Sequence, residues 1–196
     1  MCRLIIGSEE YGEAFDYIKN GMTHRLEMRH ALHSRLSPNT NSFVYSEKEK
    51  TMIRDMMQED KTIFMAMAKD FYSSKAVAHN IDVKIIETTF DTAINEPHRM
   101  RAYIIEDDDK PVGFALTSFY YATEIGGTVV LLEDLYLDET CRGKGFGSKF
   151  IEFMEKEYPA AKRFHLEVAK ENIRAIDLYK RLGYEVLEYV QMVKNK

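Results

Sequence analysis

Apolar and polar side chains alternate along some stretches of this chain and recur every three to four positions along others. Residues 52–56 alternate, which is typical of a β-strand. Residues 58–72 carry apolar side chains at every fourth position, with further ones beside them, which predicts an amphipathic helix. A second helix is expected to begin after Asp82, because an aspartate side chain is a favourable N-cap. This part of the chain is therefore expected to form one strand and two helices.

Three strands are predicted next, because three segments rich in β-forming residues are separated by turns: residues 100–105, 111–121 and 128–137. An acidic turn at 106–110 joins the first two strands, and a pair of glycines after residue 125 joins the last two. Short connections of this kind favour antiparallel neighbours, so we expect a meander.

The pattern changes after residue 137, where strands and helices begin to alternate. It predicts a glycine-rich loop, a helix that Pro159 ends, a strand over 163–169, a helix over 172–182 closed by Gly183, and a final strand over 184–193. Alternation of this kind after a meander predicts an α/β (α+β) fold, in which helices flank a mixed, mostly antiparallel sheet.

The first fifty residues follow a different pattern. Two short helices are expected over 9–19 and 24–36, followed by a cluster of turn-forming residues at 37–42. We therefore divide the chain into an N-terminal extension, residues 1–50, and one domain, residues 52–196. The three histidines of the extension match no zinc-ligand spacing, so no metal is expected.

The composition narrows the class of protein. Of 196 residues, 45% are hydrophobic and 30% are charged, as in ordinary globular domains, and the net charge is −5. Basic residues form no stripe, so nucleic acid is not expected as a partner. No run of about 18 apolar residues is present, so no contact with a membrane is expected. With two cysteines and an apolar start too short for a secretory leader, the expected compartment is the cytoplasm.

Three alternating glycines lie in the loop between the strand at 128–137 and the next helix, in the order Arg142-Gly143-Lys144-Gly145-Phe146-Gly147. Glycine lets the backbone come close to a ligand, and the free amides of a helix start favour an anion. The two cations add positive charge, so the loop predicts a phosphate site. A Walker loop requires Gly-Lys-Ser/Thr and a dinucleotide loop requires Gly-x-Gly-x-x-Gly, and neither spacing is present.

The loop pattern Arg142-x-x-Gly145-x-Gly147 and a second segment, Asn172-x-x-Ala175-x-x-Leu178-Tyr179, resemble the GNAT superfamily of N-acetyltransferases. The resemblance covers about residues 52–196. It implies a sheet whose central strands splay apart to hold acetyl-CoA. It also implies direct transfer of the acetyl group to an amine in a ternary complex, without a metal.

The resemblance assigns cofactor contacts to three parts of the chain. The strand would present main-chain groups to the pantetheine arm, the loop amides would hold the pyrophosphate, and the second segment would contact the cofactor from the other side. The residues concerned are Leu135, Tyr136 and Leu137, then Arg142, Gly143, Lys144, Gly145, Phe146, Gly147 and Ser148, and finally Asn172. Asn172 also suits a helix N-cap.

The pair Glu133-Asp134 resembles a feature of spermidine/spermine and related diamine acetyltransferases. An amine is protonated at neutral pH, so a base beside it gives the departing proton a route out. Consecutive strand residues point to opposite faces, so only one of the two is expected to face the reacting centre. Glu133 is the expected base, and Asp134 is expected to orient the amine or to act as the base instead. Tyr179 matches the family tyrosine that donates a proton or hydrogen bond to the leaving sulfur.

The acceptor is less defined than the cofactor. A small-molecule amine and a peptide amine both remain open, and the residues expected around the acceptor are Tyr72, His79, Tyr120, Tyr121 and Glu124. A homodimer is a further expectation at the level of the family. The alternative function is a non-catalytic acyl-CoA-binding sensor or regulatory module, which would bind the cofactor without turnover.

Overall fold

The computed structural model describes residues 51–74 and 81–195 of the chain. The predicted extension, with its helices and histidines, lies outside the described residues. The unit described below falls within Glu49–Lys196.

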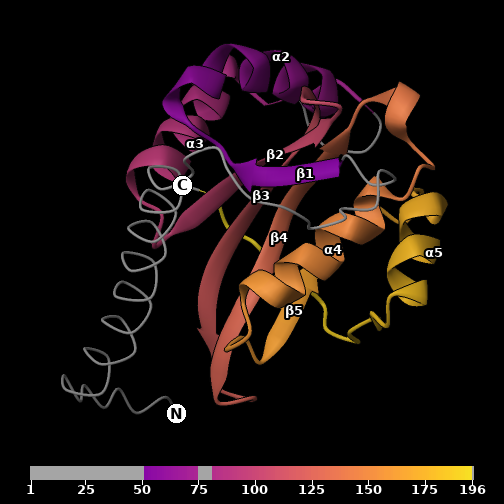
Figure 1. The fold of residues 1–196 in the computed structure, drawn as a ribbon. Helices are drawn as coiled ribbons and strands as arrows, with labels where there is room; N and C mark the ends of the chain where they lie inside the picture. Colours follow the sequence, from indigo (N-terminus) through magenta and orange to yellow (C-terminus); the bar gives the residue numbers. More distant parts are fainter. Residues whose placement is uncertain (1–50, 75–80, 196) are drawn as a thin grey trace, which may run out of the picture. The chain divides into compact units, whose positions relative to one another are not determined.

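A five-stranded sheet forms the centre of this unit, with the strands in the order β1-β2-β3-β4-β5 (Figure 1). The strands are β1 (Thr51–Asp55), β2 (Met100–Asp107), β3 (Lys110–Ala122), β4 (Gly127–Leu137) and β5 (Arg163–Leu166). The first four strands pair antiparallel, and β4 pairs with β5 in parallel. The predicted meander and the mixed, mostly antiparallel sheet are confirmed.

The helices begin close to the predicted positions. They are α2 (Lys61–Tyr72), preceded by the 3-10 turn η1 (Gln58–Asp60), then α3 (Val83–Asn95), α4 (Phe146–Glu157) and α5 (Ile173–Arg181), with a second 3-10 turn η2 (Glu139–Cys141) before α4. Asp82 caps α3 as predicted, because its side chain accepts a hydrogen bond from Lys84 N at 2.9 Å.

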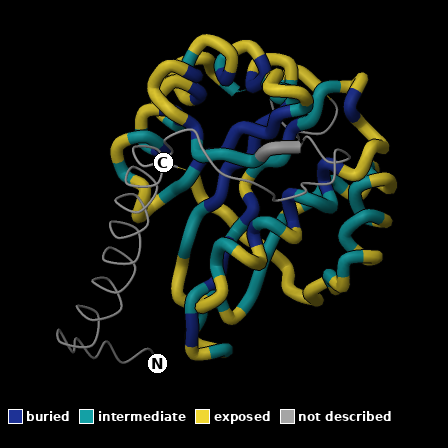
Figure 2. Tube along the Cα trace, viewed as in Figure 1, coloured by how far each residue is buried: buried dark blue, intermediate teal, exposed yellow. Residues whose placement is uncertain are grey.

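Two apolar cores lie on the two faces of the sheet, and Figure 2 shows the buried strands between helices with exposed outer surfaces. One core, here called the α2-side core, joins α2 and α3 to the sheet around Phe64, Phe90 and Phe114. The other, the α4-side core, joins α4 to the opposite face around Phe150 and Met154. Burial of each helix's apolar stripe explains why the spacing of these residues predicted the helices.

The predicted final strand over 184–193 is absent from the structure. Its apolar side chains are exposed, with Val190 at 90% and Met192 at 92%. Gln191 Nε2 reaches Glu167 Oε1 at 2.7 Å, so the segment passes near the end of β5 without pairing along it. β-forming residues favour extended backbone, but a strand also needs a partner edge of matching length. β5 offers a short one, because it ends at Leu166 rather than at the predicted residue 169.

Candidate active site

Opposite the middle of β3, β4 carries one extra residue. Leu116 pairs with Asp134, whereas the next residue of β3, Thr117, pairs with Leu132. Glu133 therefore forms a β-bulge, with no residue of β3 directly opposite it. A bulge of this kind interrupts the alternation of side chains along the strand.

The bulge brings two carboxylates onto one face of the sheet. Leu132 before the bulge and Leu135 after it both contact the α4-side core. Because neighbours alternate within each regular part of the strand, Glu133 and Asp134 both lie on the other face, toward α2 and α3. The expectation that their side chains point to opposite faces is therefore wrong, since the inserted residue resets the alternation.

Asp134 is partly buried and accepts a hydrogen bond from the Tyr72 hydroxyl at the end of α2. Burial raises the pKa of its carboxyl from 3.8 to about 6, the bond from Tyr72 opposes this rise, and the charge of Glu133 adds to it. A carboxyl with this pKa is mostly ionised at pH 7 and can still take up a proton, which is what a general base requires.

Glu133 has a different environment from its neighbour. Its side chain is exposed, and its Oε1 accepts a hydrogen bond from Ser118 Oγ of β3 at 2.6 Å. An exposed carboxylate held in place by a hydroxyl can attract a cation without a large desolvation cost. The two adjacent carboxylates are therefore suited to different tasks, one to proton transfer and the other to holding positive charge.

From the bulge onward, β4 has no described partner strand on the β5 side, because β5 ends at Leu166. Their parallel pairing ends at Leu132 and Leu166, whereas β4 continues to Leu137. On this side, no described strand pairs with residues 133–137. The end of β5 therefore leaves an open main-chain edge of β4 next to both carboxylates, at the place where the resemblance predicts a splay between strands.

The main-chain groups of β4 alternate between β3 and this open edge. Asp138 N, just after β4, donates to Val112 O of β3 at 2.8 Å. By the alternation of an antiparallel pair, Tyr136 also directs its main chain at β3, whereas Leu135 and Leu137 direct theirs at the open edge. Leu135 and the N–H group of Leu137 are thus placed to pair with an extended ligand, whereas Leu137 O already accepts a hydrogen bond from Arg142 Nε. Tyr136 instead buries its side chain in the α2-side core.

The loop before α4 has the features of an anion site. Gly143 and Gly145 have φ of 83° and 90°, which side chains rarely adopt. Gly145 is the N-cap of α4 and supplies no side-chain oxygen, so the amides of the first helical turn remain available. A Cβ at Gly145 would meet no described atom within 4 Å beyond the adjoining residues, so the space beside this glycine is open.

Gly147 serves a different purpose from the other two loop glycines. A Cβ there would lie 3.1 Å from Leu178 Cδ2, so this glycine allows α4 to approach α5 closely. Phe146 is buried in the α4-side core, and only its main chain is placed to meet a ligand. The predicted cofactor contacts of these two residues, and of Ser148, therefore rest on their amides.

Three cationic side chains lie around the loop, and hydrogen bonds hold one of them in place. Arg142 Nε donates to Leu137 O at 3.1 Å, and its Nη1 donates to Glu139 Oε1 at 3.0 Å. Lys144 is exposed. Arg174 of α5 reaches the same loop, because its Nη2 lies 3.0 Å from the Cβ position of Gly143. Arg174 was not predicted from the sequence, because it occupies one of the two positions between Asn172 and Ala175 at which the motif accepts any residue.

Two further predicted residues lie on or beside α5. Asn172 is its N-cap, and its Oδ1 accepts a hydrogen bond from Ala175 N at 3.2 Å. Tyr179 is partly buried against the α4-side core, and its ring centre lies 5.8 Å from that of Tyr184. Burial raises the pKa of the Tyr179 hydroxyl, so the hydroxyl is protonated at neutral pH and can donate.

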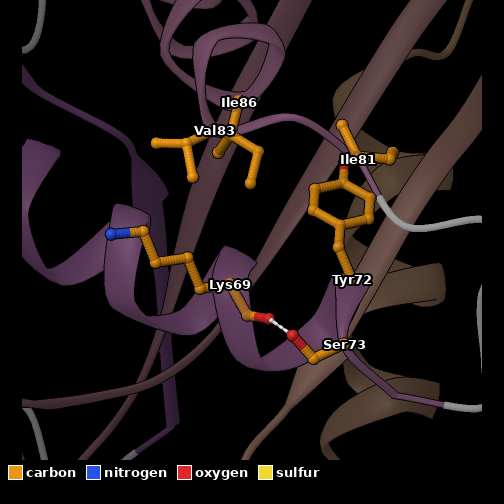
Figure 3. A pocket seen from close by; sticks show the side chains of 6 residues that line it. All are labelled: Lys69, Tyr72, Ser73, Ile81, Val83 and Ile86. Atoms are coloured by element: carbon orange, nitrogen blue, oxygen red, sulfur yellow. Dashed lines mark hydrogen bonds between the residues drawn. The ribbon is translucent and has the colours of Figure 1, made fainter.

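A cavity of about 320 Å³ lies between the end of α2 and the start of α3 (Figure 3). It is lined by Lys69, Tyr72, Ser73, Ile81, Val83 and Ile86. Tyr72 belongs both to this cavity and to the hydrogen bond with Asp134. Tyr72 therefore connects the cavity to Asp134, although neither carboxylate of the bulge lines the cavity.

The other residues expected around the acceptor are more dispersed. Tyr120 Oη lies 2.9 Å from His165 Nδ1, and Glu124 forms an ion pair with Arg163. Tyr121 is exposed, and His79 lies outside the described residues. Within 51–74 and 81–195, no group of three or more His, Cys, Asp or Glu side chains is arranged to hold a metal. In the same ranges, no helix has the length and apolar character needed to cross a membrane.

Comparison with known proteins identifies relatives of the chain. Residues 53–184 match the acetyltransferase (GNAT) family. Thialysine N-epsilon-acetyltransferase of Mus musculus is 29% identical over 146 residues, which cover 70% of this chain and 85% of that protein. The same-named protein of Sus scrofa is 39% identical over 74 residues, which cover 37% of this chain and 43% of that protein.

A bacterial relative and a solved structure extend the comparison. Spermine/spermidine N(1)-acetyltransferase of Bacillus subtilis is 33% identical over 79 residues, covering 38% of this chain and 52% of that protein. The chain thus aligns with about half of that relative's length. The structure of AAC(6')-Iy in complex with the bisubstrate analog CoA-S-monomethyl-acetylneamine has a TM-score of 0.63 and 17% identity, covering 76% of this chain and 99% of that chain. This last similarity is one of fold.

Proposed function

The chain belongs to the acetyltransferase (GNAT) family, and we propose that it transfers the acetyl group of acetyl-CoA to a primary amine by direct attack in a ternary complex. The observation that carries the proposal is the open edge of β4, which leads from the glycine loop to two carboxylates on one face of the sheet. A cofactor site and a proton acceptor thereby adjoin one another.

The described residues fit acetyl-CoA. The φ angles of Gly143 and Gly145 and the open space beside Gly145 suit close approach of a pyrophosphate to main-chain amides. Leu135 and Leu137 present main-chain groups suited to an amide-containing arm. Arg174 adds positive charge beside the loop. When bound, acetyl-CoA supplies an acetyl group activated as a thioester.

Removal of the amine's proton is the step for which the carboxylates are suited. For an amine with a pKa of about 10.4, deprotonation at pH 7 costs about 4.6 kcal/mol. We assign the base to Asp134, whose pKa is raised by burial to about 6, and the orientation of the amine to exposed Glu133. These roles reverse the first choice made from the sequence, which assigned the base to Glu133.

Tyr179 is assigned the hydrogen bond to the leaving sulfur, and its replacement by phenylalanine is expected to lower kcat about 100-fold. The neighbouring Tyr184 provides the control, because its hydroxyl is buried and has no hydrogen-bond partner in the described part of the chain. Tyr184→Phe should leave kcat near the wild-type value and should not reduce stability. Steady-state kinetics of both variants test the assignment, and an equal loss of kcat in the two would contradict it.

The acceptor is proposed to be a small amine. The Mus musculus and Bacillus subtilis relatives are named for thialysine and for spermine/spermidine, and the cavity beside Tyr72 is of small-molecule size. A panel of polyamines, lysine-like amines, aminoglycosides and N-terminal peptides, assayed by release of coenzyme A thiol, would identify the class. Turnover with peptides alone would overturn the small-amine assignment.

The alternative function is a sensor that binds acyl-CoA without transferring the acyl group. Calorimetric binding of acetyl-CoA together with silence across the whole amine panel would favour it. The carboxylate at the bulge with a near-neutral pKa favours the enzyme, because a sensor has no need for a buried proton acceptor.

A further inference from the structure

Tyr72 links three parts of the site that are distant in sequence. It is the last residue of α2, its ring packs against the α2-side core, and it lines the cavity between α2 and α3 (Figure 3). Its hydroxyl donates to Asp134 Oδ2 on the bulge of β4, 62 residues further along the chain. Within the described residues, no side chain donates a hydrogen bond to the other carboxylate oxygen, Asp134 Oδ1.

We propose that Tyr72 is a positioning residue for acetyl transfer, which fixes the Asp134 carboxylate by binding Oδ2 and leaves Oδ1 to receive the proton of the amine. This inference rests on the proposed function, because it assigns a partner to the base of that reaction. Tyr72 contacts the base and lines the cavity, but it does not itself take up the proton.

The Tyr72 hydroxyl is well suited to remain a donor. Burial, together with the charges of Asp134 and Glu133, holds the pKa of this hydroxyl far above its usual value of 10.0. The hydroxyl therefore stays protonated through the neutral range and cannot compete as a base. A donated hydrogen bond stabilises the ionised form of Asp134, which partly offsets the effect of burial.

The elements packed around Asp134 supply few other charges. On β4 itself the neighbouring group is Glu133, whose charge favours the protonated form of Asp134. From β3 the paired residue is Leu116, which is apolar. From α2 the facing group is Tyr72. Among the described residues, Tyr72 is therefore the group that keeps this carboxylate ionised.

The test is the pH dependence of kcat/KM in Tyr72→Phe. Loss of the donor should move the acid limb upward by about one pH unit, from about 6 to about 7, so that the ratio of wild-type to variant kcat/KM is about fivefold larger at pH 6 than at pH 8.5. Tyr103→Phe is the matched control, because it removes a tyrosine hydrogen bond to Tyr158 on the opposite face of the sheet. Its acid limb should stay at the wild-type position. An equal loss for Tyr72→Phe at every pH would overturn the proposal.

A second measurement separates this inference from the proposed function. The carboxyl of Asp134 can be titrated by carbon NMR in wild type and in Tyr72→Phe, with its signal assigned by its absence in Asp134→Asn. We expect the pKa of Asp134 to rise by about one unit in Tyr72→Phe. If the pKa rises although no amine is acetylated, Tyr72 does control the ionisation of Asp134, and it is the proposed function that fails. If it does not change, the positioning role is wrong whatever the activity.

Discussion

Replacing Gly145 by valine is expected to weaken the binding of coenzyme A by about 100-fold or more, equivalent to at least about 2.7 kcal/mol. The new side chain would project into the open space at Gly145, the N-cap of α4, where no described atom beyond the adjoining residues lies within 4 Å of the Cβ position. It would block the ligand rather than the core. Calorimetry with coenzyme A measures the loss directly.

The control for this variant is Gly126→Val in the turn between β3 and β4. Gly126 also has a positive φ, of 60°, and its Cβ would also meet nothing within 4 Å. Both substitutions therefore carry a similar backbone strain of about 1–2 kcal/mol. Gly126→Val should lower the melting temperature comparably and leave the affinity for coenzyme A unchanged. Retained affinity in Gly145→Val would mean that the loop is not the pyrophosphate site.

Asp134→Asn is expected to lower kcat by about 10²–10⁴-fold and, at the same time, to stabilise the protein above pH 6. Burial raises the pKa of Asp134 from 3.8 to about 6, so the ionised form is the less favourable one in the folded state. The resulting penalty is absent below about pH 4, grows as the pH rises to about 6, and is then complete, with an upper limit of about 3 kcal/mol. Urea unfolding at pH 4 and pH 7.5 should show stabilisation by Asp134→Asn only at the higher pH.

Glu133→Gln provides the comparison that separates the two carboxylates. Because Glu133 is exposed and assigned to holding the amine, its replacement should raise KM more than it lowers kcat. A large loss of kcat in Glu133→Gln with a mild one in Asp134→Asn would reverse the two roles. If Asp134→Asn stabilised the protein at pH 4 as well, the stabilisation would not come from removing the charge of Asp134.

Much of the fold could be predicted because each helix repeats its apolar residues at one period. The buried side chains Phe64 and Met67 of α2, and Phe150 and Met154 of α4, recur at helical spacing, and each set meets one face of the sheet. The absence of the strand expected over 184–193 could not be predicted in this way. These residues favour extended backbone, but local preference does not reveal whether a neighbouring edge is long enough to pair with.

The spacing of apolar residues along β4 contains a sign of the bulge, which is missed when strict alternation is assumed. The residues of β4 that contact the α4-side core are Val130, Leu132, Leu135 and Leu137, so one interval is three where the others are two. That single irregular step moves Glu133 and Asp134 to the same face. The contact between Tyr72 and Asp134 had no comparable signal, because it depends on how α2 lies across the sheet.

Because β5 ends after four positions paired with β4, the remaining residues of β4 leave a gap beside the sheet that a ligand can fill as a missing strand. Main-chain groups along this gap can bond to water while it is empty and to the ligand once it is filled. The folded state should therefore be most rigid when the metabolite that bridges the gap is abundant. Through this gap, the lifetime of the protein in a cell would depend on the supply of that metabolite.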